Sequence, residues 1–123
     1  MSKNKPTILV IEDDSVQREL LNEFLAEQGF SLLFAKDGLE GLEKIKKYKY
    51  DLVIADIRLP YVSGIGLIKC LRQEHPTIPI ICVTGYGQYP KEIAEELSPD
   101  VLLEKPYDLN VLIKNINHLL KLK

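Results

Sequence analysis

The chain has 123 residues, of which 46% are hydrophobic and 28% are charged, and its formal net charge at pH 7 is −2. This size and composition are typical of one compact domain and argue against a disordered chain. No apolar run approaches the ~20 residues of a membrane-spanning helix, and the small net charge argues against direct nucleic-acid binding, which a basic surface dominates. Residues 1–6 are polar, lack the apolar segment of a secretory signal and predict a loose lead-in to a cytoplasmic protein.

Five short apolar runs predict strands. They are residues 7–11, 31–35, 51–55, 78–84 and 100–104. The first, third and fourth runs are almost continuously apolar, which is typical of strands that are covered on both faces of a parallel sheet.

Apolar residues at helical spacing follow each of these runs. In chain order they are Val16, Leu20, Leu21, Phe24 and Leu25; Leu39, Leu42 and Ile45; Leu67, Ile68 and Leu71; Ile93, Ala94 and Leu97; and Leu109, Leu112, Ile113, Ile116, Leu119 and Leu120. Asp14 or Ser15 is expected to cap the first helix, and Asp108 the last. Asp37, with Glu40 three residues later, resembles a capping box for the second helix.

Strict alternation of strands and helices predicts an α/β fold. Gly29, Pro60, Pro79 and Pro106 fall in the proposed connections. Because each strand is followed by a helix, the pattern predicts five βα units in a single domain over residues 1–123. Such units form a doubly wound parallel sheet with helices on both faces.

The cysteines and histidines do not suggest a metal or catalytic site. Cys70 and Cys82 lack metal-type spacing and are expected to be buried thiols in a reducing compartment, not a disulfide. His75 and His118 have no partner at ligand or catalytic spacing.

Polar side chains stand directly after four of the predicted strands. They are Glu12 and Asp13 after the first, Asp56 after the third, Thr84 after the fourth and Lys105 after the fifth. In an open parallel sheet, functional residues collect at the carboxyl ends of the strands. If the first and third strands are neighbours, the three carboxylates converge on one pocket.

Converging carboxylates need a partner of opposite charge. Two such charges ~4 Å apart repel by about 4 kcal/mol at an effective dielectric constant near 20, so either one takes up a proton or a cation joins them. A site with only two or three carboxylates suits Mg²⁺. With the ammonium of Lys105 and the hydroxyl of Thr84, the group could receive a phosphoryl group, and Asp56 is the natural nucleophile, since a carboxylate can form an acyl phosphate.

Four segments, ILVIEDDSVQREL, DLVIADIRLPYVSG, IICVTGYG and LLEKPYD, resemble in order and spacing the signatures of response-regulator receiver domains of two-component signalling. The resemblance covers about residues 7–120. It implies a flavodoxin-like five-stranded sheet in the order 2-1-3-4-5, with Asp56 as the phosphoacceptor of a sensor histidine kinase. Thr84 and Lys105 would bind the phosphoryl oxygens, and the bond between Lys105 and Pro106 would often be cis.

The resemblance also implies a metal site. Asp13, Asp56 and the backbone carbonyl of Arg58 would hold Mg²⁺, and Glu12 would support the ion. Phosphorylation would then change the face formed by the fourth helix, the fifth strand and the fifth helix, and so control a partner.

Three features depart from the family pattern. Leu102 occupies a position where the family usually has an aromatic residue that rotates on activation, so we expect a different coupling, carried by the loop at residues 85–90. Arg58 and Tyr86 flank the line along which water would attack the phosphoryl group and are expected to set its lifetime. The segment at residues 98–100 replaces a glycine–alanine pair.

Alternative functions remain at this point. An aspartyl phosphatase would need an acid where Arg58 stands, and arginine cannot donate and retrieve a proton at neutral pH. A phosphorylation-independent binding module is favoured only by Leu102, and a flavin-binding protein lacks a phosphate-cradling loop. We therefore expect a signalling domain, not an enzyme, with a histidine kinase or phosphotransfer protein upstream and an output domain or protein downstream. It would be a monomer or an activation-linked homodimer.

Overall fold

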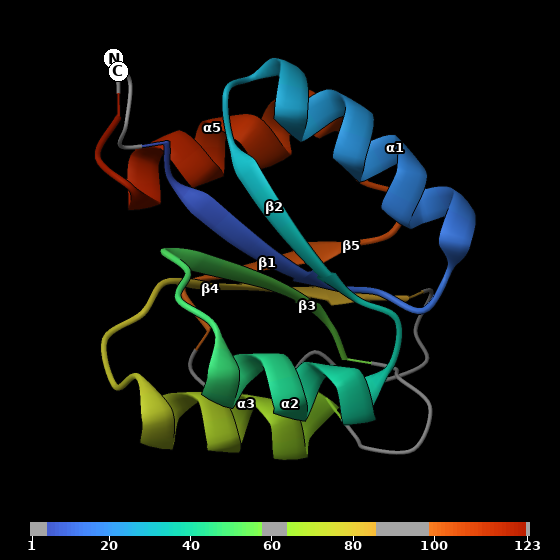
Figure 1. Cartoon of the computed structure of the whole chain (residues 1–123). Coiled ribbons are helices and arrows are strands. Elements are labelled where there is room, and N and C mark those ends of the chain that lie inside the picture. Colours follow the sequence, from blue (N-terminus) through green and yellow to red (C-terminus); the bar gives the residue numbers. More distant parts are fainter. Residues whose placement is uncertain (1–4, 58–63, 86–98, 123) are drawn as a thin grey trace.

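The computed structural model describes residues 5–57, 64–85 and 99–122, and its centre is a five-stranded parallel sheet. The strands are β1 (Thr7–Ile11), β2 (Ser31–Ala35), β3 (Leu52–Asp56), β4 (Ile80–Thr84) and β5 (Val101–Glu104). Their order in the sheet is β2-β1-β3-β4-β5 (Figure 1). The predicted fold class and strand order are therefore confirmed.

Helices cover both faces of the sheet. They are α1 (Ser15–Glu27), α2 (Gly38–Lys47), α3 (Gly64–Glu74) and α5 (Leu109–Leu119). Figure 1 shows α1 and α5 on one face and α2 and α3 on the other. The helix predicted around Ile93 lies outside the described residues. No helix in the described part of the chain is long and apolar enough to cross a membrane.

Three strands differ from their predicted bounds: β3 lies one residue later in the chain, and β4 and β5 begin later than predicted. The fourth strand begins at Ile80, not at Ile78. Pro79 has no N–H to give to a ladder, although its carbonyl accepts a hydrogen bond from the N–H of Val53 at 3.1 Å. The third strand includes Asp56 as its last residue, so this carboxylate is held by the regular backbone of the sheet.

Alternate residues along each strand pack into two separate hydrophobic cores. On one face, Leu9 and Ile11 of β1 join a cluster that also contains Leu67 of α3. On the other, Ile8 and Val10 join a cluster with helices α1 and α5. Because consecutive side chains of a strand point to opposite faces, both faces are apolar, as the continuous runs predicted.

The apolar positions of α1 are only partly buried. Leu21 and Leu25 lie in the core, whereas Val16 is 67% exposed and Leu20 43% exposed. Two of the five apolar residues that predicted this helix therefore lie outside the core. Their positions lie next to the core stripe, where α1 meets solvent.

The predicted helix caps are present, with one change. Asp14 caps α1 and Asp108 caps α5. Asp37 caps α2 by accepting from the backbone N–H of Glu40 at 2.9 Å. The carboxylate of Glu40 accepts from the N–H of Lys36 at 2.9 Å, so the return bond of the capping box lies one residue before the cap.

Two aspartate side chains bind the first residues of β1 and β4, at the end of the sheet opposite the candidate site. The Oδ2 atom of Asp51 accepts from the N–H of Thr7 at 2.8 Å, and that of Asp100 accepts from the N–H of Ile80 at 2.7 Å. In both pairs a backbone bond runs the other way, since each aspartate N–H donates to the carbonyl of the same partner. Arg72 adds a contact to Asp100 at 3.5 Å. The carboxylates thus satisfy N–H groups at the starts of β1 and β4.

Both cysteines are free thiols in different surroundings. Cys82 is fully buried in β4, and burial raises the pKa of its thiol to about 12. Cys70 is half-buried, so the expectation of two buried thiols was right only for Cys82. Leu102 pairs in register with Cys82 and packs against the same core cluster.

Candidate functional site

Three carboxylates meet at the carboxyl ends of the two central strands. Ile11 of β1 and Ala55 of β3 are register partners, so the next residues, Glu12 and Asp56, emerge side by side. Asp13 follows directly. One oxygen of each carboxylate lies within 4.8 Å of the others, and the predicted acidic cluster is therefore formed.

Two of the three carboxylates are removed from solvent. Glu12 is 4% exposed and Asp56 5% exposed, whereas Asp13 is exposed. Burial raises the pKa of Glu12, and the negative charge of Asp56 raises it further. The N–H of Asp14, which donates to Glu12 Oε2 at 3.1 Å, and the positive charge of Lys105 offset part of this rise. The cluster therefore holds more negative charge than its surroundings favour.

Lys105 supplies a positive charge to this cluster. Its Nζ atom lies 2.8 Å from Asp56 Oδ2 and 3.2 Å from Glu12 Oε1. Its backbone N–H donates to the carbonyl of Thr84 at 2.8 Å, and its peptide bond to Pro106 is cis, as the resemblance implies. Burial alone would lower the pKa of the ammonium, but the hydrogen bond to Asp56 and the charges of both carboxylates raise it. Lys105 is therefore positively charged at neutral pH.

Thr84 ends β4 beside the acidic cluster and is 2% exposed. Asp56 is in register with Val83, so Thr84 lies one residue farther toward the carboxyl edge. Its backbone is held on the β5 side, where Thr84 is in register with Glu104 and its carbonyl accepts from the N–H of Lys105. Arg58 and Tyr86, which were predicted to contribute to the site, lie outside the described residues.

Two residues near the cluster were not singled out from the sequence. Arg18 donates from Nη1 to the backbone carbonyl of Glu12 at 2.8 Å. Tyr107 is half-buried, and burial, together with the negative charge of Glu12, raises the pKa of its hydroxyl to about 12. For Arg18, the available signal was its place one turn into the helix that follows the acidic residues.

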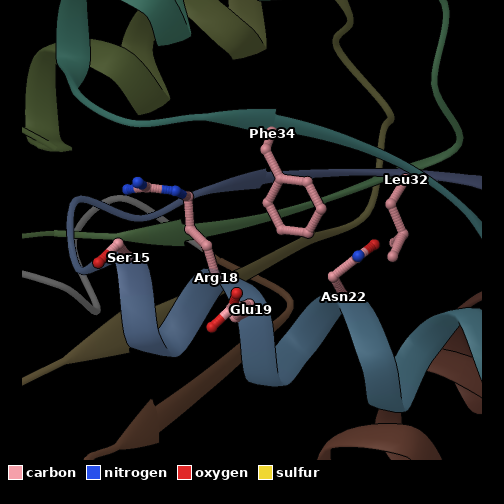
Figure 2. A pocket seen from close by; sticks show the side chains of 6 residues that line it. All are labelled: Ser15, Arg18, Glu19, Asn22, Leu32 and Phe34. Atoms are coloured by element: carbon pink, nitrogen blue, oxygen red, sulfur yellow. The ribbon is translucent and has the colours of Figure 1, made fainter.

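A groove of about 470 Å³ adjoins this region between α1 and the edge strand β2. Its lining residues are Ser15, Arg18, Glu19, Asn22, Leu32 and Phe34. Figure 2 shows the Asn22 side chain directed toward β2 and the Arg18 guanidinium directed to the loop that follows β1. The groove therefore has an apolar strand side and a polar helix side.

The comparisons with known proteins agree with this geometry. Residues 8–117 match the family model described as the response regulator receiver domain. The chain belongs to this family. It is 40% identical over 116 residues to an uncharacterized response regulatory protein of Vibrio cholerae, a match that covers 92% of this chain and 48% of that protein. The receiver domain spans about half the length of the curated relatives it matches.

Solved receiver structures have the same fold. A Francisella response regulator receiver domain is 30% identical, with a TM-score of 0.86 and 95% of this chain and 98% of that chain covered. The response regulator TrrA of Thermotoga maritima, solved in complex with Mg(2+)-BeF, is 32% identical, with a TM-score of 0.84 and 93% and 98% covered.

Replacing Glu12 by glutamine should raise the metal-free stability of the receiver domain by about 1 kcal/mol at pH 7, because it removes one like charge from the cluster. The raised pKa of Glu12 determines how its contribution to the free energy of unfolding changes with pH. This contribution stabilises the folded state below the pKa of about 4.5 that Glu12 has in the unfolded chain. It is lost as the pH rises through the higher pKa of the folded state. Urea unfolding of both proteins between pH 4 and 8 should show a difference that grows with pH; a constant difference would contradict this.

Proposed function

We propose that this receiver domain accepts a phosphoryl group on Asp56 from a histidine kinase or a phosphotransfer protein. The observation that carries the proposal is the bond of 2.8 Å from Lys105 Nζ to Asp56 Oδ2, inside a cluster that also contains Glu12 and Asp13. A carboxylate that is buried and paired with a fixed ammonium is placed to react, since the ammonium can also meet the oxygens of an incoming phosphoryl group.

The donor set of the cluster fits Mg²⁺. The groups are carboxylate oxygens, which suit a hard cation, and they are too few to form an all-protein cage. We propose Asp13, Asp56 and the backbone carbonyl of Arg58 as direct ligands, with Glu12 supporting the ion. When bound, the ion would supply positive charge that offsets the charges of the carboxylates and of the phosphoryl oxygens. The receiver TrrA was solved in complex with Mg(2+)-BeF, which supports Mg²⁺ as the ion.

The proposed transfer is a displacement at phosphorus. A carboxylate oxygen of Asp56 forms the new P–O bond while the bond from phosphorus to the donor nitrogen breaks, and the donor imidazole keeps that electron pair. Lys105 and Thr84 then hold the new phosphoryl oxygens with an ammonium and a hydroxyl. The domain would use a small acyl phosphate in the same way, with the P–O bond of the donor breaking, and water would later attack phosphorus to restore Asp56.

The proposed consequence is a shift between two arrangements of the face that includes β5 and α5. Moving such an equilibrium from 1:99 to 99:1 needs about 5.5 kcal/mol of differential interaction. Charge-assisted hydrogen bonds to one phosphoryl group can supply much of this. With Leu102 packed into the core beside Cys82, we infer that Thr84 transmits the change without a rotating ring at Leu102.

The relatives support a wider role. Because they are about twice as long as this chain, and several are named transcriptional regulators, we propose that the domain controls an output domain or a separate protein. It would act in the cytoplasm, either as a monomer or as a homodimer that forms on activation.

Intact-mass spectrometry after incubation with a small acyl-phosphate donor tests the phosphoacceptor proposal. Wild type should gain one phosphoryl group with Mg²⁺ present and none with the metal chelated. The Asp56→Asn variant, which keeps the size of the side chain, should gain none under either condition. An adduct of equal yield on the variant would rule out Asp56, and failure of folded wild type to bind Mg²⁺ would favour a phosphorylation-independent binding module.

A further inference from the structure

Arg18 connects α1 to the acidic loop through the backbone, not through a carboxylate. Its Nη1 atom donates to the carbonyl oxygen of Glu12 at 2.8 Å in a partly buried position. The backbone N–H of Glu12 donates to the carbonyl of Ala35 at 3.0 Å. The peptide groups on both sides of the Glu12 Cα are therefore held, one by β2 and the other by Arg18.

The direction of the two acidic side chains depends on these peptide groups. Glu12 and Asp13 are consecutive, and the carbonyl that Arg18 binds belongs to the peptide bond between them. Rotation of that peptide would turn Asp13 away from Asp56 and would move the Asp14 N–H off Glu12 Oε2, where it now donates at 3.1 Å. The strand ends at Ile11, so the sheet ladder does not fix this peptide.

The side chain of Arg18 runs along a groove that partly removes it from solvent. It is half-buried in the groove between α1 and β2, whose strand side is formed by Leu32 and Phe34. Figure 2 shows it running from α1 toward the loop after β1, while the Phe34 ring comes from the strand side of the groove. When the groove restricts the apolar stem of a long side chain, less conformational entropy is lost as the guanidinium forms its hydrogen bond than for a fully exposed side chain.

We propose that Arg18 is a positioning residue for the cation site, setting the orientation of Glu12 and Asp13 through the carbonyl of Glu12. This inference rests on the proposed function of the acidic cluster. Groups that orient metal ligands without touching the ion typically change metal affinity about 10–100-fold when they are removed. The bond is short and charge-assisted, which places it among the stronger contacts of this kind.

Arg18→Met is the sharpest test, because methionine keeps an unbranched apolar stem in the groove and removes the donor and the charge. By calorimetry, the variant should bind Mg²⁺ at least about 10-fold more weakly than wild type. Arg18→Lys, which keeps a donor and a charge, should recover most of this affinity. Asn22→Ala, a change in the same groove, should bind Mg²⁺ as wild type does. Equal affinity of wild type and Arg18→Met would overturn the proposal.

A metal-free measurement separates this inference from the proposed function. Amide hydrogen exchange at Asp14, whose N–H is bonded to Glu12, should be about 10-fold faster in Arg18→Met and unchanged in Asn22→Ala. Wild-type exchange at Asp14 in Arg18→Met would overturn the positioning role even if Asp56 accepts phosphate. Faster exchange in a protein that binds no Mg²⁺ would overturn the cation site while leaving the bond to the loop intact.

Discussion

Replacing Lys105 by methionine is expected to lower the free energy of unfolding of the metal-free receiver domain by about 2–3 kcal/mol at pH 7. The ammonium contacts two nearly buried carboxylates, on Asp56 and Glu12, and its loss leaves both charges without this partner. The pKa of Lys105 is raised in the folded state. Its contribution to the free energy of unfolding is therefore fully present below the ordinary pKa of lysine and is lost as the pH rises through the pKa of the folded state. Urea unfolding at pH 7 measures the effect.

Lys47→Met is the matched control for this substitution. Lys47 forms an ion pair with Glu43 at 3.2 Å, but the two side chains are 66% and 55% exposed. Exposed pairs of this kind contribute about 0.3–0.5 kcal/mol. We also expect Mg²⁺ to stabilise Lys105→Met more than wild type, because the ion and the ammonium neutralise the same carboxylates. Equal losses in the two lysine variants would contradict the assigned role of Lys105.

Replacing Asp100 by alanine is expected to cost about 2 kcal/mol, which is large for a residue at the edge of the sheet. The change leaves the N–H of fully buried Ile80 without its carboxylate acceptor, and unpaired buried donors cost about 1–3 kcal/mol. It also removes the contact of Asp100 with Arg72. Chemical denaturation followed by circular dichroism would measure the loss.

Asp51→Ala provides a comparison within the same molecule. Asp51 makes the same pair of bonds with Thr7, but water can reach this backbone group when the carboxylate is removed. The expected cost is therefore smaller, about 0.5–1 kcal/mol. If Asp51→Ala cost as much as Asp100→Ala, burial of the N–H would not be the cause.

Much of the architecture could be predicted because local signals agreed with one another. The apolar runs of β1 and β2 gave the bounds of both strands correctly, since each run begins at a polar residue and is followed by a charged one. Asp14 and Asp108 cap their helices through contacts with residues two or three positions away. Such short-range contacts are visible in sequence spacing, whereas the strand order came from the resemblance to receiver domains.

The remaining features depend on contacts that spacing does not encode. Asp100 reaches Ile80 across twenty positions, and no local pattern distinguishes it from an ordinary turn residue. Arg18 binds a backbone carbonyl, which every residue has, so the side chain of its partner gives no signal of this bond in the sequence. At the site, the sequence placed Glu12 and Asp56 at the ends of two strands, but the unequal burial of the carboxylates and the direct contact with Lys105 required the folded chain.

Chemical trapping of the phosphorylated residue tests the central claim most directly. Borohydride reduces an aspartyl phosphate to homoserine, so the modified position can be read from peptide fragments of wild-type protein after incubation with donor and Mg²⁺. The account predicts homoserine at position 56 in that sample and none when the metal is chelated. Homoserine at Asp13, or a phosphoryl adduct on the protein with none of it trapped at position 56, would contradict the assignment of Asp56 as the phosphoacceptor.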